Sequence, residues 1–293
     1  MLKLIKKNTI RKISKSKKRF ISILIITLLG TGIFVGLKST SSNMIKTLDS
    51  YLDNTNSYDI KIISSLGLTE KDITSLKNLS TVNQVTGSYF KDVMADLGDR
   101  KATIQLNSIN QNINNIELIE GRLPIKNDEI LIEPALIKRN NGIKIGDYIE
   151  VNDESLEFSK FQIVGTVKSS LYVGPETYSG SRGLTTIGNG NINYYAYVLE
   201  DTIKTDYYPV IYITVKDAKN KVTNSDEYKE TVKNAVAEIE TIKDENEKIR
   251  YSDIFTSANN EINSKISEGE KELSKYKEQL ETADKELKKE IMN

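Results

Sequence analysis

The residue types that most often carry out chemistry in proteins are largely missing from this sequence. Its 293 residues include no histidine and no cysteine. This composition excludes Ser-His-Asp and Cys-His nucleophile pairs, zinc sites with His or Cys ligands, and disulfide bonds. The acidic residues are scattered, and none follows the spacing of an EF-hand calcium loop. We therefore expect no catalytic residue and no metal site.

Two short patterns contain residue types that occur in catalytic or phosphate-binding sites, but neither has the sequence context of such a site. Ser14 and Lys17 have the spacing of a Ser-Lys dyad, yet they lie in a basic segment beside an apolar run. Gly188-Asn189-Gly190 does not continue as G-x-G-x-x-G, and G-x-x-x-x-G-K-[ST] does not occur. No phosphate-binding loop is present, so we expect no cofactor, no ATPase activity in this chain and no enzyme.

An unbroken apolar run dominates the N-terminal region. Residues 20–37 carry no charge, and a helix of that length reaches roughly 27 Å, the thickness of a bilayer's hydrocarbon core. We predict a transmembrane helix over residues 20–38. A cleaved signal peptide is the alternative, but the run is long for one and no A-x-A-like site follows it.

The charges are distributed unevenly about this run. Residues 1–38 hold ten of the 41 basic residues and no acidic residue; residues 39–293 hold the other 31 together with all 41 acidic residues, a net charge of −10. The positive-inside rule then places the N-terminus in the cytoplasm and the rest outside the cell. An acidic exterior argues against nucleic acid as a partner. An exported chain without cysteine fits the cell membrane of a bacterium, and a Gram-positive one best.

The segments beside the apolar run have patterns of their own. Residues 1–19 fit an amphipathic helix on the inner membrane face, or a polybasic tail held by anionic lipid. Gly32 and Gly36 form G-x-x-x-G, a spacing that allows another helix to pack closely but that also occurs by chance. Residues 39–57 continue the helical pattern as a stalk.

Residues 58–254 have the pattern of an α+β domain with a β-rich insertion at about residues 98–205. Thr69 and Asp72 have capping-box spacing before a short helix, and a longer helix is predicted from Asn224. Alternation and apolar runs predict strands over residues 58–62, 101–106, 129–132, 147–151, 156–167, 194–199 and 210–215.

Residues 255–293 have the pattern of the start of a coiled coil, with charged residues between the apolar ones. A helix of this kind needs a partner, so we expect the sequence to be a fragment or the helix to pair with another chain. Packing of the helix back on the domain is the alternative. The seam is formed by Phe255, Ala258, Ile262, Ile266, Gly269, Leu273, Tyr276, Leu280, Ala283 and Leu287.

Three stretches, in this order, carry a family resemblance. The first is the basic segment followed by the glycine-bearing apolar helix. The third is residues 161–167, which include Gly165. Between them, the second stretch comprises residues 120–124, 128–132 and 142–147. Its motif residues are Gly121, Arg122, Leu123, Gly142, Gly146 and Asp147. Together these stretches resemble the N-terminal part of an FtsX/MacB-type ABC transporter permease.

The resemblance implies a MacB-like extracellular core domain whose motifs are structural. It also implies a separate cytoplasmic ABC ATPase subunit, a second permease copy or further membrane helices, and a lipid bilayer as partners. Family permeases have four or more membrane helices, whereas this sequence has one, so an N-terminal fragment is expected.

The function predicted from the resemblance is that of a permease subunit in an export or mechanotransmission system. The alternative is a single-pass surface protein whose outer domain and coiled coil mediate adhesion or signalling. A surface hydrolase would need a nucleophile-base pair, which the sequence does not offer.

Overall fold

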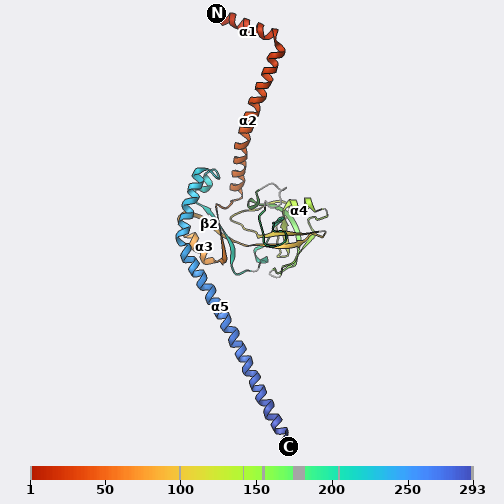
Figure 1. Ribbon diagram of the computed structural model, residues 1–293, viewed down its shortest axis with the longest axis vertical. Helices are drawn as coiled ribbons and strands as arrows, with labels where there is room; N and C mark the ends of the chain where they lie inside the picture. The colour runs from red at the N-terminus through yellow and green to blue at the C-terminus, as the bar shows by residue number, and fades with distance from the viewer. Residues whose placement is uncertain are drawn as a thin grey trace.

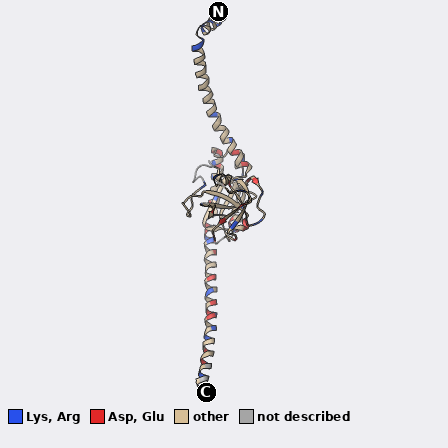
Figure 2. Ribbon diagram, turned by 90° about the vertical axis from the view of Figure 1, so that its right-hand side faces the viewer, with Lys and Arg blue, Asp and Glu red and all other residues tan. Residues whose placement is uncertain are grey.

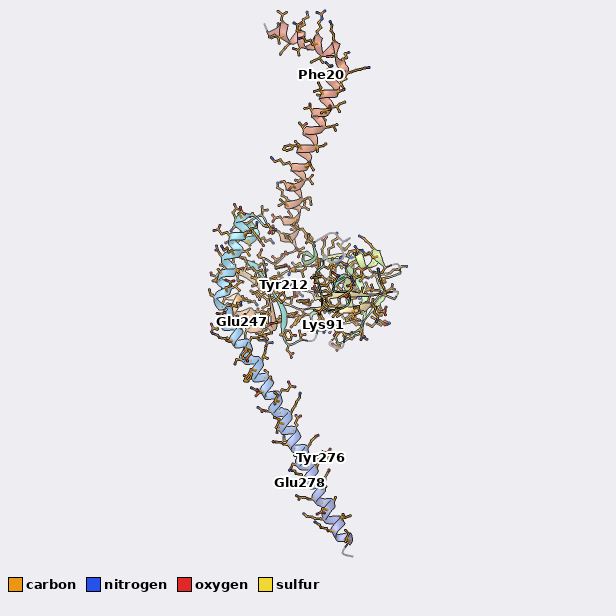
Figure 3. The ribbon with its side chains drawn as sticks, viewed as in Figure 1. Phe20, Lys91, Tyr212, Glu247, Tyr276 and Glu278 are labelled. Carbon is orange, nitrogen blue, oxygen red and sulfur yellow. The ribbon has the colours of Figure 1, made fainter. Side chains whose placement is uncertain are left out.

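The computed structural model describes residues 2–98, 100–140, 142–153, 156–173, 182–203 and 205–291. The molecule is elongated, with a folded domain in the middle and one long helix leaving it on each side (Figure 1). The two termini therefore lie at opposite ends of the structure. Figure 3 shows Phe20 on one of these helices and Tyr276 on the other, with Tyr212 inside the domain between them.

Two helices form the N-terminal arm: α1 (Leu2–Lys15) and α2 (Lys17–Asn54). They meet at Ser16, where the chain bends so that α1 lies across the direction of α2 (Figure 1). The apolar part of α2 packs against nothing in the described part of the chain, and Phe34 is 68% exposed. By length and composition, α2 is the one described helix that could cross a membrane.

The smaller of two sheets in the domain has three antiparallel strands in the order β1-β10-β2. Helix α3 (Glu70–Lys77) and the first half of α5 (Asp226–Ile291) cover it, because their apolar residues join its core. The strands are β1 (Ile60–Leu68), β2 (Val82–Ser88) and β10 (Tyr208–Val215).

The larger sheet has seven strands in the order β5-β8-β6-β9-β4-β3-β7. Because β7 also pairs with the start of β8, six of these strands close into a ring. Strand β5 pairs with the second half of β8, from Gly165 to Lys168. The ring encloses the main core, which includes Ile104, Phe161 and Ile163. The strands are β3 (Phe90–Asp96), β4 (Lys101–Ser108), β5 (Glu117–Gly121), β6 (Glu129–Ile132), β7 (Tyr148–Val151), β8 (Lys160–Lys168) and β9 (Tyr194–Val198).

Short helical turns fill the connections: α4 (Pro134–Arg139), η1 (Ser170–Tyr172), η2 (Glu200–Thr202) and η3 (Ala218–Asn220). The predicted α+β class is confirmed, with its N-terminal apolar helix and long C-terminal helix. The segment boundaries and the coiled coil stay predictions.

Some local predictions are confirmed and others are wrong. The capping box forms, and Thr69 N donates to the Asp72 carboxylate at 2.7 Å. The strand predicted from Leu156 begins at Lys160 instead, and Leu156 makes only an isolated bridge to Ile203. Residues 174–193 are rich in Gly, Ser and Asn, a composition that predicts a loop, and residues 174–181 of this stretch lie outside the described residues.

Helix α5 runs without interruption for 66 residues, although the sequence pattern predicts two segments. Its first half is held to the domain by Glu238, whose carboxylate accepts hydrogen bonds from the backbone N–H groups of Ser80 and Thr81, both at 2.9 Å, and from their hydroxyls. A further ion pair joins Lys71 and Asp253 at 2.6 Å. Beyond residue 254 the helix leaves the domain, its apolar residues exposed and charges of both signs along its length (Figure 2).

We expect Glu238→Gln to loosen the first half of α5, because an amide offers one acceptor oxygen where the carboxylate offers two. These hydrogen bonds lower the pKa of Glu238 from 4.5 to about 2. Their contribution is therefore complete above pH 4.5 and is lost as the pH falls through about 2. Amide hydrogen exchange over residues 226–250 should speed up by about tenfold. The exposed Glu240→Gln is the control, and equal exchange in both variants would contradict this role for Glu238.

Candidate functional site

Nothing in the described ranges resembles a catalytic or metal centre. No group of three or more His, Cys, Asp or Glu residues there could hold a metal ion. The arrangements that connect distant parts of the chain are of another kind. One fixes the end of α2 to the domain, and the other organises the strands around β8.

The first arrangement clamps the last turn of α2 with the loop between β4 and β5. The carbonyl of Thr55 accepts a hydrogen bond from Asn115 N at 2.7 Å, and that of Asn56 accepts one from Asn114 N at 3.0 Å. The Asn114 side chain in turn accepts from Tyr58 N at 3.0 Å. Because this loop connects two strands of the seven-stranded sheet, the end of α2 is tied directly to that sheet.

The first arrangement includes a second set of hydrogen bonds, a second clamp, which ties α2 and the residues after it to the start of α5. Asp49, on α2, accepts a hydrogen bond from Thr223 N at 2.7 Å, three residues before α5 begins. Asp59 accepts from Val215 N and from the Tyr228 hydroxyl, both at 2.7 Å. Burial raises the pKa of Asp59. The base of α2 and the residues that directly follow it are therefore bonded to the β4–β5 loop of the larger sheet, to the end of β10 in the smaller sheet and to the start of α5.

The second arrangement, the glycine–arginine cluster, consists of Gly121, Arg122, Glu129, Gly146 and Gly165. Gly121 of β5 lies opposite Gly165 of β8 in the strand register. Neither has room for a side chain. A Cβ atom at Gly165 would lie 2.5 Å from the Glu120 carbonyl oxygen, and one at Gly121 would overlap the Val164 carbonyl. Gly121 also has φ +84°, a conformation that other residues rarely adopt. Two backbones thus approach each other because both positions are glycine.

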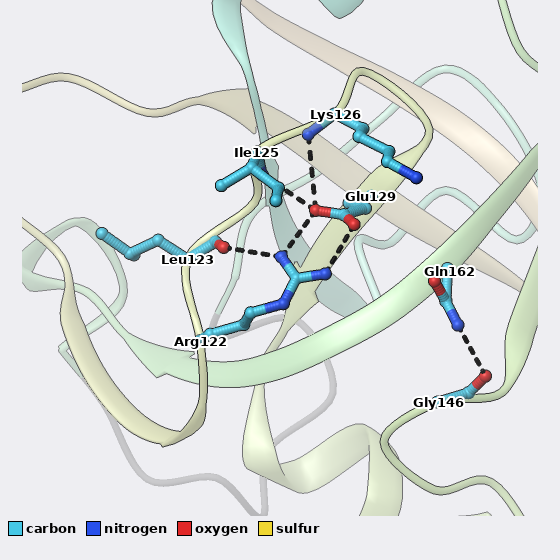
Figure 4. A network of polar contacts seen from close by, with 7 residues as sticks. All are labelled: Arg122, Leu123, Ile125, Lys126, Glu129, Gly146 and Gln162. Atoms are coloured by element: carbon cyan, nitrogen blue, oxygen red, sulfur yellow. Dashed lines mark hydrogen bonds and ion pairs between the residues drawn. The ribbon is translucent and has the colours of Figure 1, made fainter.

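Arg122 and Glu129 form the polar part of the cluster (Figure 4). The guanidinium Nη1 and Nη2 donate to the two carboxylate oxygens at 2.7 and 2.6 Å. Ile125 N donates to the same carboxylate at 2.8 Å. Glu129 is buried and Arg122 is half-exposed. The hydrogen bonds from Arg122 are the main cause that lowers the pKa of Glu129 to about 2.

The remaining motif residues shape the turn before β7. Gly146 N donates to Ile163 O of β8 at 2.8 Å, and Asp147 accepts from Lys144 N at 2.8 Å. Gly142 and Gly146 have φ of +113° and +100°. Leu123 contributes its carbonyl, which accepts from Arg122 Nη1 at 3.0 Å. The cluster holds β5, β6 and β7 around β8 and offers no reactive group.

The structure does not bring all predicted site residues together. Gly121, Arg122, Gly146 and Gly165 meet along β8, and Leu123 and Asp147 flank them. Gly32 and Gly36 lie on α2, and a Cβ atom at either glycine would meet nothing within 4 Å. Their role as a helix-packing face stays a prediction.

The sequence patterns missed a buried ion pair. Arg182 Nε donates to Glu133 Oε2 at 2.7 Å, and the two side chains are only 4% and 2% exposed. In the sequence Arg182 follows a stretch rich in Gly and Ser, which gives no signal of burial. Glu133 directly follows the apolar run of residues 129–132, and this position was the one hint in the sequence that Glu133 is buried.

No family model matches the sequence, and the comparison with curated proteins finds no match. Solved structures do show similarity. The extracellular domain of the noncanonic ABC-type transporter YknZ from Gram-positive bacteria is 18% identical with a TM-score of 0.34, covering 57% of this chain and 80% of that chain. The periplasmic region of MacB from Actinobacillus actinomycetemcomitans is 14% identical with a TM-score of 0.34, covering 58% and 72%.

A third structure, a domain of a protein assigned as a permease from Porphyromonas gingivalis, is 16% identical with a TM-score of 0.33, covering 61% of this chain and 70% of that chain. These neighbours belong to the class of protein that the sequence resembles.

Proposed function

We propose that this chain is a permease-type subunit of an ABC export or mechanotransmission system, in which a separate cytoplasmic ATPase moves the extracellular domain through α2. The observation that carries the proposal is the continuity of α2. One helix extends from the basic segment, through the apolar run, to the clamps at the domain. The ordered motifs that resemble FtsX/MacB-type permeases add to it.

A membrane position for the apolar part of α2 follows from its surface. Large apolar side chains there are exposed all around the helix, including Leu28 at 65% and Phe34 at 68%. In water this exposure is unfavourable, whereas lipid covers such a surface. Basic residues gather at the bend between α1 and α2 (Figure 2). By the positive-inside rule, this distribution supports a cytoplasmic position for α1 and an extracellular position for the domain.

The stalk, residues 38–54, is suited to transmitting a movement of the apolar part of α2 to the domain. Residues 38–54 continue as helix for roughly 25 Å beyond the apolar run. The residues that directly follow this helix are bonded to the loop between β4 and β5, to the end of β10 and to Tyr228 of α5. A tilt or shift of α2 would therefore move the domain as a body and swing the free half of α5.

The first test is co-purification of the full chain in detergent with candidate cytoplasmic ABC ATPases encoded beside it. We expect a stable complex. We also expect ATP to change the fluorescence of a fluorophore attached to the cysteine of Ser274→Cys, in the free half of α5. Because the sequence has no other cysteine, the fluorophore labels this position alone.

Ser42→Pro, in the exposed stalk, should abolish that response while leaving the complex intact, because proline breaks the helix that links the two ends. Ser42→Ala should behave as the unaltered chain. Failure of every ATPase to co-purify, or an unchanged response in Ser42→Pro, would contradict the proposal.

The second candidate is a single-pass surface protein for adhesion or signalling. The exposed apolar residues on the free half of α5 favour it, since they offer a surface for another helix. Co-purification separates the two candidates: this one is supported if the chain binds no ATPase but self-associates, and if polar substitutions at Leu273 and Leu280 abolish that self-association.

A further inference from the structure

The free half of α5, residues 255–291, carries a row of exposed apolar side chains. Within it Ile262 is 55% exposed, Leu273 56% and Leu280 71%. A helix of this length extends roughly 55 Å. In water such a row is unfavourable unless another surface covers it.

This row lies on the side of α5 that faces away from the domain. The first half of α5 packs on the domain through residues that include Ala235 and Ile239. Ile262 and Ile266 follow these two residues by about seven and a half turns of the helix. Because α5 is uninterrupted, the two pairs lie on opposite sides of it. The domain on which α5 packs therefore does not cover the row.

The course of the two long helices sets the direction in which a second copy would approach. In both views α2 and the free half of α5 leave the domain at opposite ends (Figures 1 and 2). Two copies held in one membrane by α2 therefore point α5 away from that membrane in the same direction. The free halves of the two copies then lie parallel and cover each other's apolar rows.

In a parallel pair the row has the heptad positions of a coiled-coil core. From Ile262 onwards, the a positions are Ile266, Leu273, Leu280 and Leu287, and the d positions are Ile262, Gly269, Tyr276 and Ala283. Gly269 and Ala283 fill little of the core. We therefore expect the association to depend on the high local concentration of two copies held in one membrane.

The charges beside this core are complementary in the same arrangement. In a parallel coiled coil each g position faces the e position five residues further along the partner helix. Lys265 then faces Glu270 of the second copy, and Glu272 faces Lys277. Lys265 also pairs with Glu261 of its own helix at 2.6 Å, but the two side chains are 72% and 68% exposed, so this pair contributes little.

We propose that the free halves of α5 from two copies in one membrane form a parallel, in-register, two-stranded coiled coil, with Lys265 of each copy facing Glu270 of the other. The pairing would join two extracellular domains far from the membrane, so a movement of one α2 would reach both. It rests on the membrane position proposed for α2 and does not depend on an ATPase.

Cysteine crosslinking of the full chain in liposomes tests the register. The sequence has no cysteine, so each variant carries one thiol. Ala283→Cys, at a d position, places the thiols of two parallel helices against each other and should give a disulfide-linked dimer under mild oxidation. Ser274→Cys, exposed on the outer side of the pair, is the matched control and should stay monomeric. No dimer of Ala283→Cys, or equal crosslinking of both variants, would overturn the proposal.

Charge reversal in the Ala283→Cys chain tests the direction of the helices. Lys265→Glu makes two contacts repulsive and should slow crosslinking about tenfold, whereas Lys275→Glu, outside the e and g positions, should leave the rate unchanged. Adding Glu270→Lys to Lys265→Glu should restore the rate. In an antiparallel pair g faces g and e faces e, so this second reversal would restore nothing. A rate that stays low in the double variant would therefore overturn the parallel arrangement, as would clumping of liposomes without crosslinking.

The result can be told apart from the test of the proposed function. A chain that crosslinks through Ala283→Cys but binds no ATPase would support the pairing and contradict the proposed function. A chain that binds an ATPase but gives no crosslink would overturn the pairing alone.

Discussion

Gly165→Ala is expected to destabilise the domain by about 3 kcal/mol, because the new methyl group would press on backbone from two sides. Its Cβ atom would lie 2.5 Å from the Glu120 carbonyl oxygen and 3.1 Å from that of Arg122. Neither oxygen belongs to a flexible side chain, so relief requires β5 and β8 to separate. Separation would break the strand pairing that places Arg122 near Glu129. Urea unfolding of the full chain in detergent, followed by the near-ultraviolet circular dichroism of tyrosine, measures the loss.

Two further glycines make this prediction specific. Gly121→Ala should be at least as harmful, since it adds a positive φ to a backbone overlap. Gly269→Ala, in the free half of α5, meets nothing within 4 Å and should leave the unfolding midpoint of the domain unchanged. If Gly165→Ala were as well tolerated as Gly269→Ala, the close approach of β5 and β8 would be wrong.

The opposition of Gly121 and Gly165 shows where prediction from sequence stops. The sequence pattern predicted a strand through Gly165, and the family motif marked Gly121, because both signals are local. The pairing of the two glycines depends on a register shift between Leu118 and Glu120. Such a shift is set by packing across the whole sheet, so no local spacing reveals it.

Strands β2 and β3 were missed for a related reason. Val82–Ser88 contains Asn, Gln and Gly, and only three of its seven positions are buried. Its strand character comes from pairing with β10, which lies more than a hundred residues away. In contrast, the Thr69–Asp72 capping box and β6 were predicted correctly, since a cap depends on neighbouring residues and β6 is a short apolar run.

The clamps and the buried Arg182–Glu133 ion pair could not be predicted either. Asn56, Asn114 and Asp49 are ordinary polar residues in the sequence, and only the fold brings their hydrogen bonds to one place. Arg182 and Glu133 are 49 residues apart. Sequence patterns find groups that share an element, whereas these sites are made from elements that the topology brings together.

Arg122→Met is expected to make the domain sensitive to acid. Glu129 has a pKa of about 2 in the folded state, below its ordinary value of 4.5, mainly because Arg122 donates to it. The stabilisation is therefore complete above pH 4.5 and is lost as the pH falls through about 2. Without Arg122 the buried carboxylate keeps only backbone donors. Its pKa should rise, and the midpoint of acid unfolding should move up by roughly one to two pH units.

Two variants separate the buried charge from other effects of Arg122→Met. The double variant Arg122→Met/Glu129→Gln removes both charges, so it should regain most of the stability at neutral pH and lose the dependence between pH 4.5 and 2. Lys160→Met removes a cation from the neighbouring strand β8. The partner of Lys160, Glu150, is exposed, so this variant should not move the acid midpoint. Circular dichroism during acid titration of the full chain distinguishes these outcomes. An acid midpoint in Arg122→Met equal to that of Lys160→Met would show that the fork to Glu129 does not hold β5 and β6 around β8.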